Sequence, residues 1–238
     1  MRQFLIFLRK WRYLFLLGTL FALLVIEPIA SSFGVMKLLF DALLVFVMAV
    51  LVFALAKERV WRVVSLLLCA PAAILSIGSH FLTATAHDMT LLAGHAMSAL
   101  FFVIVTGKIV QSIFATHELT WDSVFGAICG FLLLGVAWGL TYATIYVANA
   151  ESFHFGTAIR PNLDRGEHSR HVFIYYSFVT LTTAGFGDVT PVSLPARTLS
   201  WVEAVTGQLY LVVLITGLIG ALVARSTGAA GDGETEKN

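Results

Sequence analysis

Long runs of apolar residues, separated by short polar stretches, dominate the hydropathy pattern of this chain. A helix that crosses a bilayer needs about 20 consecutive, mostly apolar residues. Runs of that kind predict six spans, near residues 13–30, 38–56, 61–79, 89–113, 122–149 and 197–223. The predicted fold class is therefore an all-α integral membrane protein with six transmembrane helices.

A further apolar run, residues 172–182, is too short to cross the membrane. As a helix it would reach about 16 Å, roughly half the thickness of the hydrocarbon layer. Such a segment must lie at the interface or re-enter the membrane, and a re-entrant backbone survives only where protein or a water-filled cavity shelters it. We therefore predict a re-entrant half-helix between helices five and six.

Composition supports a membrane protein and excludes several other classes. Hydrophobic residues make up 58% of the chain and charged residues 12%, against roughly 45–50% and about 25% in soluble domains. Two cysteines, both within apolar runs, exclude a disulfide scaffold. A formal net charge of +1 offers no basic surface, so we expect a lipid bilayer and no nucleic acid as the partner.

Basic residues predict the orientation of the chain, because cytoplasmic segments carry an excess of Lys and Arg. The basic segments are residues 1–12, with Arg2, Arg9, Lys10 and Arg12, and the connection after span two, with Lys57, Arg59 and Arg62. Placing both in the cytoplasm, with six crossings, puts both termini there. Residues 224–238 are Gly-rich and polar, and they are predicted to form a disordered cytoplasmic tail.

The segment with the most specific chemistry follows the half-helix and reads Thr-Thr-Ala-Gly-Phe-Gly-Asp from Thr182 to Asp188. Glycine adopts backbone angles that other residues resist, so Gly185 and Gly187 would let successive carbonyls face one side of the chain. Four such chains around an axis would form rings of carbonyl oxygens, with the Thr183 hydroxyls lowest, that can replace a cation's hydration shell. The partially negative end of the half-helix would favour a cation too. The alternative to a row of carbonyl ligands is that Gly185 and Gly187 form an ordinary turn between helices.

This segment resembles the pore signature of tetrameric potassium channels, Thr-x-Gly-(Tyr/Phe)-Gly-Asp, and the resemblance extends over residues 172–223. It implies a homotetramer around a central pore, with K+ as the permeant partner and no cofactor. The selectivity filter that it implies consists of Thr183, Ala184, Gly185, Phe186 and Gly187, with K+ coordinated at Thr183, Ala184, Gly185 and Phe186.

The resemblance also implies roles for residues around the filter. Asp188 matches the acid at the outer mouth of the pore. Tyr175 and Tyr176 fall where many family members have a Trp pair that braces the filter, and Thr182 is a further supporting residue. Gly207 falls at the hinge glycine of the inner helix, where it either lets the helix bend or permits close packing.

Two filter residues depart from the commoner pattern of the family. Phe186 replaces a tyrosine, so it has no phenolic hydroxyl to bond to the bracing helix. Ala184 replaces a valine, which leaves less side-chain bulk behind the filter. We expect a filter that is held less firmly than usual, with weaker selectivity or more gating at the filter itself.

The chain divides into a four-helix membrane domain, residues 13–113, and a pore domain, residues 122–223. The pore domain is predicted to contain helix five, an outer loop (150–171), a pore helix (172–182), the filter (183–187) and helix six (197–223). This layout resembles voltage-gated channels, whose fourth span carries several arginines. Here that span carries Lys108. Because each charge moved gains about 2.3 kcal/mol per 100 mV, we predict little intrinsic voltage sensing.

Helices five and six contain residues of special interest. Glycines four residues apart, at Gly126 and Gly130 and at Gly135 and Gly139, predict close packing against the sixth span or the first four. Glu203 lies well inside the last apolar run, where a carboxylate is costly and is a candidate functional residue. It either faces the cavity, or lies behind the filter with a hydrogen bond to a Thr or Ser of the half-helix, or is a protonated structural group.

The function predicted from the sequence is a potassium-selective channel that conducts K+ passively across a cell membrane, with a prokaryotic inner membrane as the expected location. A weakly selective monovalent cation channel on the same scaffold is the first alternative. A non-conducting membrane subunit is the second. We do not expect an enzyme, because the sequence contains no arrangement of nucleophile and base.

Overall fold

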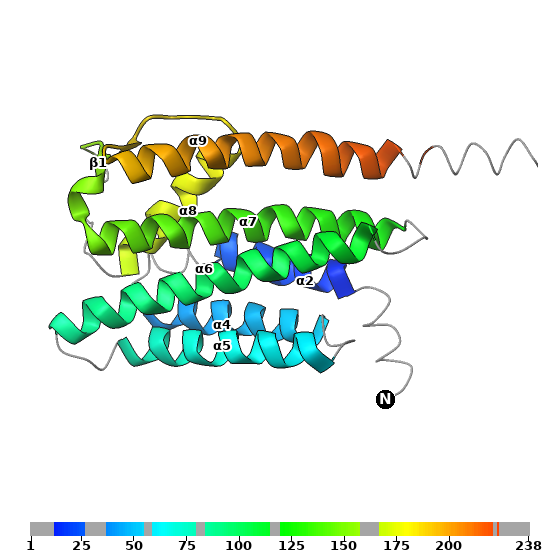
Figure 1. Cartoon of the computed structure of the whole chain (residues 1–238), viewed down its shortest axis with the longest axis horizontal. Coiled ribbons are helices and arrows are strands. Elements are labelled where there is room, and N and C mark those ends of the chain that lie inside the picture. Colours follow the sequence, from blue (N-terminus) through cyan, green and yellow to red (C-terminus); the bar gives the residue numbers. More distant parts are fainter. Residues whose placement is uncertain are drawn as a thin grey trace, which may run out of the picture.

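The computed structural model describes residues 12–26, 37–54, 59–79, 84–114, 120–157, 167–220 and 223. Almost all of these residues are helical, and most of the helices lie side by side in an elongated bundle (Figure 1). The predicted N-terminal segment up to residue 11 and the predicted tail, residues 224–238, lie outside the described residues.

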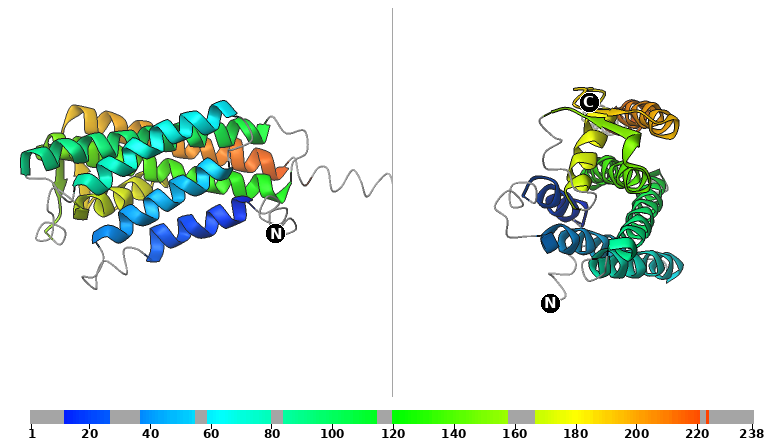
Figure 2. Two further views of the ribbon diagram at one scale, coloured as in Figure 1. Left: turned by 90° about the horizontal axis from the view of Figure 1, so that it is seen from below. Right: turned by 90° about the vertical axis from the view of Figure 1, so that its left-hand side faces the viewer.

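The first four predicted spans are all occupied by helices. These are α2, Arg12–Phe21, continued by the π-helical η1, Ala22–Ile26; α4, Lys37–Ala54; α5, Arg59–Ser79; and α6, Ala84–Phe114. Helix α5 packs against α4 and α6 at one edge of the bundle, and α6 also packs along α7, Trp121–Ala148 (Figure 2).

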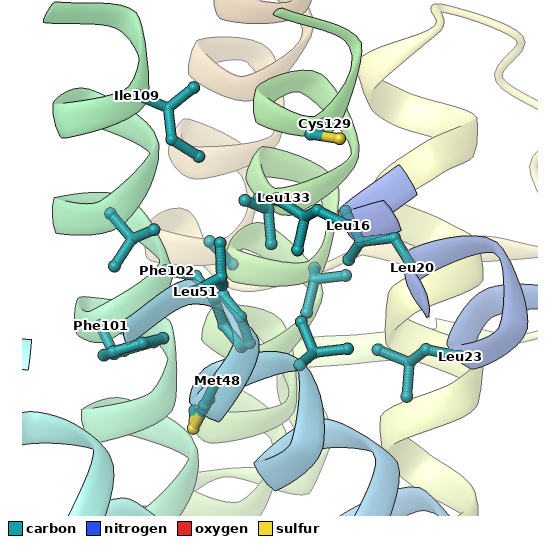
Figure 3. Packing of buried hydrophobic residues seen from close by; sticks show 14 of the residues in the cluster. Leu16, Leu20, Leu23, Met48, Leu51, Phe101, Phe102, Ile109, Cys129 and Leu133 are labelled. Atoms are coloured by element: carbon teal, nitrogen blue, oxygen red, sulfur yellow. The ribbon is translucent and has the colours of Figure 1, made fainter. Parts of the chain in front are cut away.

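An apolar core joins these helices to α7. In α2 and its continuation η1, Leu16, Leu20 and Leu23 recur at spacings of three and four residues, which places them on one face. They belong to one apolar cluster with equally buried side chains of α4, α6 and α7, namely Met48, Leu51, Phe101, Phe102, Ile109, Cys129 and Leu133 (Figure 3). Close packing of this kind holds helices together in a membrane, where the lipid is as apolar as the side chains.

Three helices of the described chain are long and apolar enough to cross a membrane by length and composition. They are Ala86–Ile113, Trp121–Ala148 and Leu194–Gly220, at the positions of predicted spans four, five and six. Shorter apolar helical stretches, Tyr13–Val25, Ala42–Val52 and Val63–Ser76, lie at the first three predicted spans. The described helices thus support three crossings, and the full set of six stays a prediction.

The C-terminal half of the described chain is built around helix α8, Glu167–Leu181. Between α7 and α8 lie a 3-10 turn, η2, Ala150–Ser152, and a strand, β1, Phe153–Phe155. After α8 come strand β2, Val189–Pro191, helix α9, Leu194–Leu209, and π-helical η4, Tyr210–Ile215. Helix α8 packs against both α7 and α9 (Figure 1).

The ends of α8 and α9 differ from those predicted. Helix α8 begins at Glu167 rather than at residue 172, because its first turns are polar and do not extend the apolar run that predicted it. Helix α9 begins at Leu194 rather than at residue 197. There the Ser193 side chain caps the helix by accepting from the Ala196 amide, and a proline occupies the first turn, where its missing N–H costs nothing.

One short β-ladder is added to the predominantly helical structure that the sequence predicted. Strand β1 pairs antiparallel with β2, with Phe153 opposite Pro191 and Phe155 opposite Val189. It lies within the predicted outer loop, 150–171, where three residues are too few to show an alternating pattern. The ladder connects the chain that enters α8 to the chain that leaves the predicted filter.

Aromatic side chains anchor this ladder to the helices. Phe153 and Phe155 point inward from β1 and are buried. The ring of Phe153 lies 4.7 Å from that of Phe173 on α8, and the ring of Tyr142 on α7 lies 5.1 Å from that of Tyr176 on α8. Edge-to-face pairs of this kind add about 0.5–1.5 kcal/mol beyond the area they bury.

The glycines of α7 mark the places where other helices approach most closely. A Cβ at Gly126 would meet the Tyr13 ring at 3.1 Å, and one at Gly130 would meet the Tyr210 hydroxyl. Gly135 and Gly139 face α8 instead, where a Cβ at Gly139 would lie 2.7 Å from the Ile174 Cα. The first pair therefore packs as predicted, whereas the second pair receives the half-helix.

Replacing Gly139 is expected to separate α7 from α8. Gly139→Ala would lower the free energy of unfolding by about 1–3 kcal/mol, because the methyl group overlaps backbone atoms that cannot rotate away. Gly107→Ala on α6 is the matched control, since its Cβ would meet nothing within 4 Å. Unfolding of the detergent-solubilised protein by added SDS measures both, and equal stability of the two variants would contradict this packing.

Candidate functional site

The predicted filter, residues 183–187, directly follows α8 and leads through Asp188 into β2. In the described part of the chain, positive φ angles occur at Thr183 (58°), Gly185 (58°) and Gly187 (77°), and not at the residues between them. A φ that alternates in sign lets successive carbonyls face one side of the chain. This is the backbone geometry that a row of carbonyl ligands requires.

The start of this segment is fixed by the way α8 ends. The Thr183 amide donates to the Thr180 carbonyl at 2.9 Å, and the Ala184 amide donates to the Val179 carbonyl at 2.9 Å. These two bonds form a Schellman motif, whose left-handed position is usually a glycine. Thr183 occupies that position although a left-handed conformation costs an L-residue about 1–2 kcal/mol. A β-branched residue kept under such strain is a candidate for function.

Residues 182–187 are exposed in a single chain. The Thr183 hydroxyl is approached from α9 by Gln208, whose Nε2 donates to Oγ1 at 3.4 Å. The Thr182 hydroxyl bonds within its own helix, to the Phe178 carbonyl at 2.7 Å. Thr183 therefore links the predicted filter to α9, whereas the Thr182 hydroxyl does not. Gln208 was not among the predicted site residues, although an amide inside an apolar span is a signal of function.

Tyr175 and Asp188 meet at the far end of the segment. The Tyr175 hydroxyl donates to Asp188 Oδ2 at 2.7 Å, and the Asp188 Oδ1 accepts from the Val189 amide at 3.0 Å. The Tyr175 ring also stacks on that of Phe186, with 6.5 Å between centroids.

Tyr176, predicted to brace the filter beside Tyr175, points the other way. Its hydroxyl lies 2.7 Å from Ser200 Oγ on α9, and its ring belongs to the aromatic cluster around Tyr142. Tyr175 contacts the filter residues and Tyr176 contacts α9, because neighbouring residues of a helix point in different directions.

Glu203 lies behind α8, where it is fully buried. Its Oε1 lies 2.5 Å from Ser177 Oγ on α8, and its Oε2 accepts from the Tyr142 hydroxyl on α7 at 2.7 Å. Ser177 Oγ is also 2.8 Å from the Gly135 carbonyl oxygen. Of the three alternatives predicted for Glu203, the geometry agrees with the one in which its side chain forms a hydrogen bond to the half-helix. A serine of the half-helix was one of the predicted partners, and Ser177 is that serine. Tyr142 was missed, because a polar residue among aromatic ones carries no pairing signal.

Gly207 lies one turn after Glu203 and touches the last residue of α8. A Cβ at Gly207 would overlap the Leu181 carbonyl oxygen and would lie 3.0 Å from Leu181 Cδ1. Close packing, one of the two predicted roles, is therefore present. Bending at Gly207 stays a prediction, although η4 begins three residues later and π-helical turns often occur at functional sites.

Comparison with known proteins identifies the class to which this site belongs. The model of a family described as "Ion channel" matches residues 130–224, which include all of α8, the predicted filter and α9. The chain belongs to this ion channel family, and its apolar helices agree with a location in a membrane. Protein LctB of Geobacillus stearothermophilus is 30% identical over 116 residues, which cover 47% of this chain and 81% of LctB. No solved structure matches the chain.

Removing the strain at Thr183 is expected to stabilise the chain. Thr183→Gly would raise the free energy of unfolding by about 1 kcal/mol, because glycine adopts positive φ without a steric penalty. The neighbouring Thr182→Gly is the control, because Thr182 has no positive φ and glycine there should destabilise the chain by about 0.5–1 kcal/mol. Unfolding of the detergent-solubilised protein measures both variants. Changes of the same sign in their free energies of unfolding would contradict the assignment of strain to Thr183.

Proposed function

We propose that this ion channel is potassium-selective and conducts K+ passively through a pore formed by four copies of the chain. The observation that carries the proposal is the alternating backbone of residues 183–187, held at the end of a half-helix within the region that matches the ion channel family. Carbonyl oxygens in such a row would replace the hydration shell of K+ at Thr183, Ala184, Gly185 and Phe186.

The length and surroundings of α8 support a re-entrant position. Its 15 residues would reach about 22 Å, less than the roughly 30 Å of the hydrocarbon layer. It packs against α7 and α9, which would supply the shelter that a re-entrant backbone needs. The partially negative C-terminal end of α8 would then point toward the middle of the membrane, where it favours a cation.

Four copies are proposed because one chain supplies one row of carbonyls, whereas a ring around an ion needs several. The exposed face of α9 supports this assembly. Trp201, Val205 and Leu209 of α9 and Val212 of η4 are exposed at spacings of three and four residues. In the apolar window of Leu194–Gly220, 20% of the residues are buried within the chain, against 61% for Trp121–Ala148. Neighbouring copies would cover this face.

Both termini would lie in the cytoplasm, as the basic segments predict.

Ion flux from proteoliposomes that contain the full-length protein tests the proposal. K+ and Rb+ are expected to pass, Na+ to be largely excluded, and Ba2+ to block. A Gly185→Val variant is expected to abolish flux, because a β-branched residue disfavours a φ of 58°, while Gly107→Ala should conduct normally. Equal flux of Na+ and K+ would favour the weakly selective channel, and no flux from the wild type would favour the non-conducting subunit.

The strictness of selection is expected to depend on the two unusual filter residues. Phe186 makes a ring contact with Tyr175 but has no hydroxyl to hold it, and Ala184 adds little bulk. The double variant Phe186→Tyr, Ala184→Val should therefore discriminate more strongly between K+ and Na+ than the wild type does. Reversal potentials in mixed K+ and Na+ measure this, and equal discrimination by the two proteins would contradict a loosely held filter.

Little voltage dependence is expected, because the one lysine of α6 is held by neighbours. Lys108 Nζ lies 4.3 Å from the centre of the Trp61 ring and donates to Gln111 Oε1 at 2.9 Å. Moving one charge through the whole field would gain at most about 2.3 kcal/mol per 100 mV. Conductance–voltage curves should be shallow in the wild type and unchanged in Lys108→Gln, and a steep curve in the wild type would contradict this.

A further inference from the structure

Two contacts between α8 and α9 lie one turn apart and in matching register. Ser177 meets Glu203, and four residues later on each helix Leu181 meets Gly207. Leu181 is the last residue of α8, directly before the turn that begins the predicted filter. A displacement of α9 at this level would therefore reach the filter through α8 rather than through a flexible loop.

The hydrogen atoms available at the first contact indicate the state of Glu203. The Ser177 hydroxyl has one hydrogen but lies close to two oxygens, the Gly135 carbonyl and Glu203 Oε1. The carbonyl can only accept, so Ser177 can donate to one of them at a time. If Glu203 carries a proton, it donates to Ser177, and Ser177 donates to Gly135. Only then is each close pair of oxygens joined by a hydrogen.

The surroundings of Glu203 agree with a neutral acid. The titratable groups that face it in the described part of the chain are Tyr142 from α7 and Tyr176 from α8. The Tyr142 hydroxyl donates to Oε2 whether or not Oε1 is protonated. A buried carboxylate without a cationic partner would be strongly disfavoured inside a membrane.

We propose that Glu203 is a protonated positioning residue of the filter, a proposal that rests on the channel function proposed above. As a neutral acid it joins α7, α8 and α9 by hydrogen bonds to Tyr142 and Ser177, and so holds the end of α8 where the filter begins. Ionisation would release the bond from Ser177 to the Gly135 carbonyl and place an unpaired charge behind the filter. Selectivity is expected to depend on this proton.

Infrared spectroscopy of the full-length protein in liposomes tests the proton without any need for conduction. The difference between wild type and Glu203→Gln at neutral pH should contain the C=O stretch of a protonated carboxylic acid. Carboxylate bands in that difference would overturn the proposal.

Permeability ratios then test the positioning role. In Glu203→Gln the amide can donate to Ser177 and accept from Tyr142, so the K+/Na+ permeability ratio should equal that of the wild type. In Glu203→Met, of similar length but without these bonds, the ratio should fall about tenfold, as expected for losing a buried hydrogen bond. Ser177→Ala breaks the same link and keeps the acid, so it should lower the ratio as well. It tests the same role if the methionine variant fails to assemble.

The pH profile separates positioning from a purely structural role. Selectivity of the wild type should fall as the pH rises and Glu203 ionises, whereas Glu203→Gln should stay selective. Tyr142→Phe identifies any contribution from that phenol. If the selectivity of this variant still falls at alkaline pH, Glu203 is supported as the titrating group. A wild type without K+ flux would defeat the channel function itself, whereas K+ flux with unchanged selectivity in both Glu203→Met and Ser177→Ala would defeat this inference alone.

Discussion

A helix that ends inside the protein must have its backbone sheltered, and this constraint organises the C-terminal half of the chain. Helix α8 is too short to cross a membrane, and its last carbonyls would be costly if they faced lipid. Gly139 of α7 and Gly207 of α9 let the two long helices approach its backbone directly. The Schellman motif at Thr183 satisfies two further carbonyls and sets the direction of the segment that follows.

The same shelter explains where polar groups are placed. Behind α8, the carboxyl of Glu203 bridges a serine and a tyrosine from two other helices, so the half-helix is fixed by directed bonds as well as by packing. At the far end of residues 183–187, Tyr175 of α8 donates to Asp188, and the β-ladder restrains the chain that follows. The chain is therefore restrained both before and after Thr183. Such restraint by the surrounding structure is how an unfavourable φ persists at a functional site.

Features with a local sequence pattern could be predicted, whereas contacts between residues far apart in the chain could not. Apolar runs located the helices, and the glycines of residues 183–187 located the segment of unusual backbone. The polar first turns of α8 at Glu167 and the three-residue strands lacked any periodic signal. For Glu203, a Thr or Ser of the half-helix was one predicted partner. Which residue it is, and the bond to Tyr142, were not predictable, because Tyr142 and Ser177 are 61 and 26 residues away in the chain and meet Glu203 only through helix packing.

We propose that residues 183–187 from four chains line one ion pathway. The most direct measurement is a crystal structure of the assembled protein in Tl+, which substitutes for K+ and scatters anomalously. We expect four chains around one axis, with Tl+ peaks on that axis between the carbonyls of Thr183, Ala184, Gly185 and Phe186. An assembly with another number of chains, or carbonyls of this segment that face lipid or protein without Tl+ peaks, would contradict it.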